Sequence, residues 1–157
     1  MTSARLARLD HRGIEALVPH RGTMCLLDRM VAWDEARIEC IARNHRDPDH
    51  PLRTRSGLLA SAAIEYAAQA AALHGGLLAQ AAGTSALPGY LASARDVRLA
   101  AWRLDDLPAA APDELHIVAE RQAGDAQRLL YAFSVAHGGR ELATGRLAVV
   151  LGGPATP

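Results

Sequence analysis

The sequence predicts an α+β fold in which an antiparallel sheet of about six strands wraps around one long central α-helix. The helix is expected over Ser61–Gly76, a run of alanine and other strong helix formers without proline. Segments on both sides of it alternate between apolar and polar residues, which is the period of a half-buried strand. One long helix among several antiparallel strands must bury itself against one face of the sheet.

Before the helix, the sequence predicts one helical turn and two strands. Pro19 disfavours helix in the preceding residue, so the turn should end at Val18. In the second strand Ile38, Cys40 and Ala42 share one face, opposite charged residues. The expected order is a lead-in over 1–13, a turn at Ile14–Val18, strands at Met24–Trp33 and Arg37–Arg43, and a polar loop over 44–56.

After the helix, the sequence predicts four more strands in the same domain. Glycine-containing pairs at 124–125 and 138–139 are typical of tight hairpin turns. The glycine-rich end at 152–157 should be a frayed tail, which leaves a single domain over 14–151. The expected elements are a loop at Ala82–Pro88 and strands at Gly89–Leu104, Glu114–Arg121, Arg128–Ala136 and Glu141–Leu151.

Composition excludes several classes of protein. The chain has 157 residues, half of them hydrophobic, and a formal net charge of zero, which argues against nucleic-acid binding and against electrostatic membrane binding. All 17 basic residues are arginine, so neither a Schiff-base lysine nor a phosphate-binding P-loop lysine is available.

The sequence also predicts a cytoplasmic protein without cofactors. No segment resembles a secretory signal or a membrane span. Cys25 and Cys40 lie in apolar stretches and are expected to be buried, reduced thiols. Neither a dinucleotide-binding motif nor ligands at metal-site spacing are visible, so no metal is predicted.

Glu65 is the unusual residue of the predicted helix. Burying an isolated carboxylate is costly, so within an alanine run it should be paired, protonated or catalytic. Gln69 follows one helical turn later on the same face and could orient the carboxyl group. An ordinary surface amide and a Glu that only ties the helix to a strand are the alternatives.

Three stretches resemble the hotdog-fold β-hydroxyacyl-acyl carrier protein dehydratases. LVPHRGTMCLLDRMV at 17–31 is similar to the family's opening motif, AIEYAAQAAALHGG at 63–76 to its helix motif I-E-x-x-A-Q, and GYLASARDVRL at 89–99 to the following strand. Their order and separation also fit. The sequence is most similar to the branch associated with aryl polyene pigments.

The resemblance implies dehydration of a β-hydroxyacyl thioester to the trans-enoyl thioester, in aryl-polyene, polyketide or fatty-acid-like synthesis. In the family a helix carboxyl and an imidazole share the proton transfers, and Glu65 matches the carboxyl. An apolar tunnel should raise the pKa of Glu65. Substrate-binding positions implied in this way are the helix start at Ala60 and Ser61, together with Gln69 and the tunnel residue Tyr90.

Two histidines are candidates for the catalytic imidazole. His50 would match the family's histidine if the loop between His50 and the helix carried a one-residue insertion. His20 lies in the opening motif. The Pro-Gly that usually opens the family's helix is replaced by Leu59-Ala60. His74 is expected to interact with the carboxyl end of the helix dipole. The remaining histidines, His11, His45, His116 and His137, are expected at the surface.

The resemblance also implies an acyl carrier protein as partner, and a homodimer or a heterodimer with another hotdog protein. Two other functions stay open. A hotdog acyl thioesterase would use the same helix carboxylate. A non-catalytic, dehydratase-like subunit would account for the shifted His50 and the missing Pro-Gly.

Overall fold

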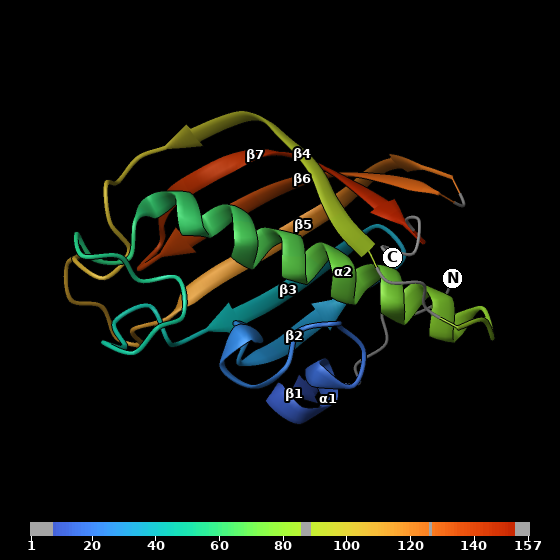
Figure 1. Cartoon of the computed structure of the whole chain (residues 1–157), viewed down its shortest axis with the longest axis horizontal. Coiled ribbons are helices and arrows are strands. Elements are labelled where there is room, and N and C mark those ends of the chain that lie inside the picture. Colours follow the sequence, from blue (N-terminus) through green and yellow to red (C-terminus); the bar gives the residue numbers. More distant parts are fainter. Residues whose placement is uncertain (1–7, 86–88, 126, 153–157) are drawn as a thin grey trace.

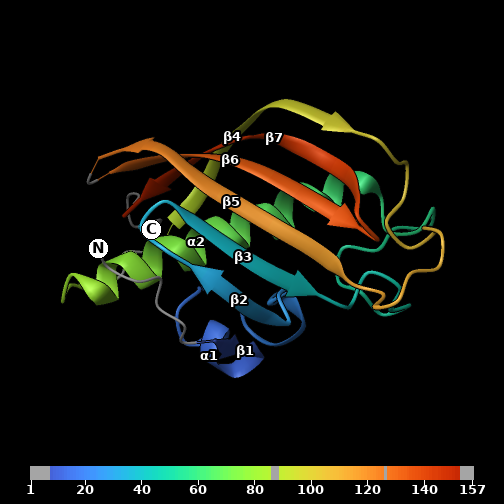
Figure 2. The same ribbon diagram turned by 180° about the vertical axis from the view of Figure 1, so that it is seen from behind.

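The computed structural model describes residues 8–85, 89–125 and 127–152, and in them a seven-stranded antiparallel sheet curves around one long helix, α2 (Figure 1). The strand order is β1-β2-β3-β5-β6-β7-β4. Seen from behind, the sheet covers the helix (Figure 2). The strands are β1 (Leu9–Asp10), β2 (Arg29–Trp33), β3 (Arg37–Ala42), β4 (Gly89–Leu99), β5 (Leu115–Gly124), β6 (Arg128–His137) and β7 (Arg140–Leu151). The helices are α1 (His11–Glu15), the 3₁₀ turns η1 (Gly22–Met24) and η2 (Ala60–Ala62), and α2 (Ala63–Ala81).

The predicted architecture is confirmed, with one more strand than expected. The extra strand is the two-residue β1, which pairs with β2 at one edge of the sheet. Residues 9–13 therefore take part in the fold, although the sequence predicted a lead-in there. Of the predicted tail at 152–157, residues 153–157 lie outside the described residues.

Helix α2 passes through Gly75 and Gly76, where the sequence predicted its end. Its C-cap is Ala82, and the next residue, Gly83, has a φ of +72°. A glycine in this left-handed conformation ends helices because L side chains rarely adopt it. The stop signal was therefore the later glycine.

Alanine on the buried face of α2 allows the sheet to approach the helix axis closely. Ala63, Ala67 and Ala70 are fully buried, together with the larger Tyr66 and Leu73. These residues belong to one hydrophobic core with the inward side chains of the sheet. Within the described residues, no helix is both long and apolar enough to cross a membrane.

The predicted strand at Met24–Trp33 is shorter in the structure. Met24 ends η1, and the backbone of Met24 and Leu26 hydrogen-bonds to the side chain of Gln69 on α2. These groups therefore do not pair with a neighbouring strand, and β2 begins only at Arg29.

Other boundaries shift by a few residues. Helix α1 occupies His11–Glu15 because Asp10 caps it by accepting a hydrogen bond from the Gly13 amide. Strand β4 ends at Leu99, five residues before the predicted end at Leu104. The antiparallel pairs β5–β6 and β6–β7 are as predicted. Both cysteines are buried and free, which confirms that prediction.

Candidate active site

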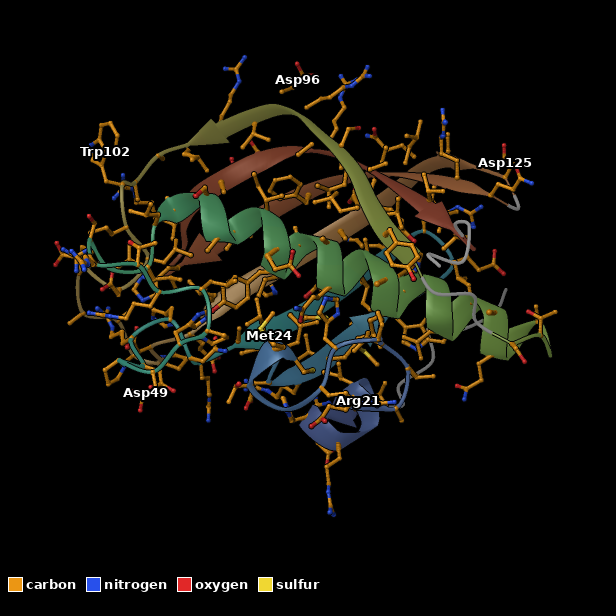
Figure 3. All side chains as sticks on the ribbon, in the orientation of Figure 1. Arg21, Met24, Asp49, Asp96, Trp102 and Asp125 are labelled. Atoms are coloured by element: carbon orange, nitrogen blue, oxygen red, sulfur yellow. The ribbon has the colours of Figure 1, made fainter. Side chains whose placement is uncertain are left out.

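Glu65 lies in the first turn of α2 and contacts His20. The distance from His20 Nε2 to Glu65 Oε1 is 3.3 Å, and both side chains are partly exposed. His20 belongs to the segment between α1 and η1, and Met24, at the end of η1, is labelled below α2 in Figure 3. The structure thus brings together the predicted carboxylate and one of the two predicted imidazoles within a single chain.

Gln69 holds the opening segment against the helix. Its Nε2 donates to the Met24 carbonyl at 2.8 Å, and its Oε1 accepts from the Leu26 amide at 2.8 Å. The same Nε2 lies 3.3 Å from Glu65 Oε1. Gln69 is completely buried, so the alternative of a surface amide is wrong. The amide fixes both the Glu65 carboxylate and the segment that follows His20.

The expected rise of the Glu65 pKa is wrong for this chain. The hydrogen bond from His20 lowers the pKa of Glu65, and this effect outweighs the opposite effect of desolvation. The hydrogen bond from Gln69 lowers the pKa further. Glu65 is therefore an ionised carboxylate near neutral pH.

His20 keeps one ring nitrogen without a partner. Its Nε2 faces Glu65, and its Nδ1 is buried without a hydrogen bond among the described residues. An ionised carboxylate only accepts hydrogen bonds, so Nε2 carries the proton of this contact.

His50 is buried, and its ring nitrogens are both engaged. Nδ1 accepts from the Leu52 amide at 3.0 Å, so the proton is on Nε2, which donates to the Tyr66 hydroxyl at 2.8 Å. That hydroxyl donates to Asn44 Oδ1 at 2.6 Å. Tyr66 follows Glu65 and projects about 100° away from it around the helix. Burial lowers the pKa of His50, which keeps the ring neutral.

At the helix start, the Ser61 amide remains unbound. Ala60 donates its N–H to the Trp102 carbonyl at 2.9 Å, and Ala62 donates to Leu59 at 3.0 Å. The Ala63 amide bonds within η2. Among the described residues, no acceptor binds the N–H of Ser61, which is exposed. Of the two predicted positions, only Ser61 therefore offers a free donor.

Tyr90 lies on the edge strand β4 and is 57% exposed. Its backbone pairs with Val150, and no side-chain hydrogen bond to Tyr90 occurs among the described residues.

Two hollows are lined by the residues that precede and follow His20 in the chain. One of about 440 Å³ is lined by apolar residues before His20 and by residues of α2, including Leu17, Pro19, Ala72 and Gly76, and by the polar Gln80, Thr84 and Ser85. Another, of about 590 Å³, lies between the segment 22–28 and the loop that carries His50.

Several histidines differ from their predicted surface or terminal positions. His74 lies inside α2, because the helix continues to Ala81, and bonds to the Tyr131 hydroxyl at 2.8 Å and the Asp34 carbonyl at 2.7 Å. His45 and His137 are buried, and each bonds to Asp113. The prediction of surface positions for these two is wrong, because sequence separations of 68 and 24 residues concealed their shared partner.

A family model described as ApeP-like, ApeP dehydratase, matches residues 12–154. The chain belongs to the ApeP-like dehydratase family. This confirms the resemblance to dehydratases of the aryl-polyene type and covers both His20 and Glu65. Among curated proteins, none matches the chain.

Solved structures show that this chain has the hotdog fold. The dehydratase heterocomplex ApeI:P from Xenorhabdus doucetiae is 23% identical, with a TM-score of 0.76 over 88% of this chain and 90% of that one. A thioesterase from Pseudomonas aeruginosa is 13% identical, with a TM-score of 0.56 over 78% of this chain and 79% of that one. Zebrafish thioesterase superfamily member 2 is 12% identical, with a TM-score of 0.56 over 92% and 99%.

Proposed function

We propose that this ApeP-like dehydratase removes water from a β-hydroxyacyl thioester to form the trans-enoyl thioester, and that Glu65 and His20 transfer the protons. The observation that carries this proposal is the 3.3 Å contact between His20 Nε2 and Glu65 Oε1, with Gln69 holding the carboxylate. His50 is the weaker candidate because both of its nitrogens serve the core.

The reaction needs one acceptor and one donor of a proton. The Cα–H bond and the Cβ–O bond break, a carbon–carbon double bond forms, and the hydroxyl leaves as water. A pair that holds one transferable proton gives it to the hydroxyl and takes the Cα proton, so it is unchanged after each turnover. Because the hydrogen bond from His20 lowers the pKa of Glu65, that proton resides on the imidazole.

The thioester carbonyl needs a hydrogen-bond donor while negative charge develops on it. The free N–H of Ser61, one helical turn before Glu65, is the available backbone donor at this end of α2. Donors aimed at a developing oxyanion lower the barrier by several kcal/mol, on the order of 3 per donor.

We further propose that the acyl group is carried by an acyl carrier protein and that a second hotdog chain completes the site, in a homodimer or a heterodimer. The pair is partly open to solvent in the single chain, and β4 is a long strand at the edge of the sheet. The structural relative from Xenorhabdus doucetiae is described as a heterocomplex. Free, buried thiols fit a cytoplasmic setting.

The test is enoyl formation from a β-hydroxyacyl group on acyl carrier protein, measured with the chain alone and with a hotdog dehydratase chain added. We expect Glu65→Gln and His20→Gln each to lower kcat by about 100-fold or more, since general acid–base catalysis contributes about that much. Glu141→Gln is the matched control because Glu141 is exposed on β7. Full activity in both site variants would overturn the proposal.

Two outcomes would favour the other functions. Release of free thiol without an enoyl product would identify an acyl thioesterase. Unchanged rates in a mixed assembly after substitution of Glu65, His20 and His50 would identify a non-catalytic subunit.

A further inference from the structure

A cluster of two buried histidines and one aspartate lies at the end of the sheet and has no part in the proposed reaction. His45 Nε2 lies 3.0 Å from Asp113 Oδ1, and His137 Nε2 lies 2.7 Å from the same oxygen. The three ligand atoms lie within 4.8 Å of one another. Both imidazoles are almost completely buried, whereas the Asp113 side chain is 39% exposed.

The sheet register assembles this cluster from three separate elements. Leu115 on β5 pairs with Ala42 on β3 and with His137 on β6. Asp113 lies two residues before Leu115, and His45 lies three residues after Ala42. The end of β3, the start of β5 and the end of β6 therefore lie together, at the left of Figure 1. His137 is thus the last residue of a paired strand, and Asp113 and His45 lie within three residues of one.

A second contact fixes the orientation of the carboxylate. Arg46 Nε donates to Asp113 Oδ2 at 2.7 Å, and its Nη2 lies 3.3 Å from Oδ1. The same guanidinium donates to the carbonyls of Asp105 and Leu107, which hold it in place. Oδ1 is thus directed at the two imidazoles. Outer hydrogen bonds of this kind orient the ligands of metal sites.

From this convergence we propose that His45 Nε2, His137 Nε2 and Asp113 Oδ1 bind one divalent transition-metal ion of the Zn²⁺ type. Two imidazole nitrogens and a carboxylate oxygen suit Zn²⁺, whereas Mg²⁺ and Ca²⁺ prefer oxygen ligands alone. The fourth position falls to water, since Asp113 gives the cluster an opening to solvent. The ion would tie the start of the His50 loop to β5 and β6.

The surroundings of His45 limit the affinity. Coordination through Nε2 places the ring proton on Nδ1, which is buried at His45 without a partner among the described residues. A missing outer partner weakens metal binding by about 10–100-fold. The positive charge of Arg46 acts in the same direction. We therefore expect micromolar rather than nanomolar binding of Zn²⁺.

The test uses the full chain without an affinity tag, titrated with Zn²⁺ against a chromophoric chelator and, separately, with Co²⁺. We expect one ion per chain and a visible spectrum typical of Co²⁺ with a low coordination number. His137→Gln and Asp113→Asn should weaken Zn²⁺ binding at least tenfold, on the order of the loss for outer partners. His116→Gln, a partly exposed histidine on β5, is the control and should bind as the wild type does.

The wild-type Co²⁺ spectrum decides the matter even if a cluster variant fails to fold. A spectrum of octahedral, solvent-exposed Co²⁺ would overturn the proposal, as would equal Zn²⁺ binding by wild type and both cluster variants. A rise of the wild-type unfolding temperature with added Zn²⁺ that is lost in His137→Gln supports the site, because an ion that binds only the folded chain stabilises it.

Discussion

At the residue scale, the two candidate histidines differ in what their ring nitrogens contact. His20 presents Nε2 to Glu65, whereas His50 uses both nitrogens inside the core. The sequence could show that each histidine had a family counterpart, but not which nitrogens were free. Which ring nitrogens are free depends on the path of the chain around Tyr66 and Leu52, and no local sequence pattern predicts this path.

The hydrogen-bonded chain His50–Tyr66–Asn44 should stabilise the core. Tyr66→Phe removes the hydroxyl, so His50 Nε2 loses its acceptor and Asn44 Oδ1 its donor. Leaving a buried polar group unpaired costs about 1–3 kcal/mol, so the free energy of unfolding should fall by about that amount. Urea denaturation measures it, and an unchanged midpoint would contradict the structural role assigned to His50.

The lowered pKa of Glu65 predicts part of the acid sensitivity of the chain. A carboxylate whose pKa in the folded state lies below the ordinary value of 4.5 stabilises the fold above that value, and this stabilisation is lost as the pH falls through the folded pKa. Wild type should therefore lose more stability than Glu65→Gln as the pH falls below the ordinary value of 4.5. Urea unfolding above and below this pH checks the difference, and parallel pH curves would refute it.

At the element scale, α2 shows where sequence patterns succeed and where they fail. Alanine content predicted the helix and its place in the core, because small side chains and high propensity act locally. The predicted end of the helix was wrong because Gly75-Gly76 resembles a helix C-cap. Of these two glycines and Gly83, only Gly83 adopts a positive φ. The 24–28 segment was predicted as strand because its apolar run does not reveal that its backbone binds Gln69.

Continuation of α2 through Gly75 predicts a stabilising substitution. An added Cβ there would meet only Leu129 Cδ1 at 3.5 Å, an ordinary contact. Gly75→Ala should raise the free energy of unfolding by about 0.5–1 kcal/mol, since glycine in a helix interior is less favourable than alanine by that amount. Thermal or urea unfolding provides the measurement.

Gly145 on β7 is the matched comparison. A Cβ there would approach Phe133 Cε1 to 2.8 Å and Val97 Cγ2 to 3.1 Å. Gly145→Ala should destabilise the fold by about 1–3 kcal/mol through overpacking. If both glycine variants changed the free energy of unfolding in the same direction, the packing described for one of the two positions would be wrong.

At the scale of the whole molecule, exposed apolar side chains gather beside one end of the edge strand β4. Leu59 and Leu99 are about two-fifths exposed and Trp102 is 92% exposed, projecting from the ribbon in Figure 3. They line a hollow beside Ala60 and Ser61 at the start of α2. The sequence predicted the need for a second chain only through the family resemblance, since exposure is a property of the assembled sheet.

Trp102→Ala should separate association from stability. Because the indole is almost fully exposed, the free energy of unfolding of the single chain should change by less than about 0.5 kcal/mol. A buried aromatic at an interface centre contributes about 2 kcal/mol or more, so self-association or pairing with a hotdog dehydratase chain should weaken at least tenfold. Sedimentation velocity compares the two proteins, and identical profiles would exclude this surface from the interface.

The hydrogen bonds of Gln69 to the segment after His20 limit how the sequence of this segment can change during evolution. Gln69 binds the backbone of Met24 and Leu26, not their side chains, so substitutions at those two positions leave its hydrogen bonds intact. An insertion or deletion between His20 and Leu26 would instead displace His20 from Glu65. The segment should therefore tolerate amino-acid substitutions but not insertions or deletions. A constant length of this segment could identify distant family members that share the Glu65–His20 pair.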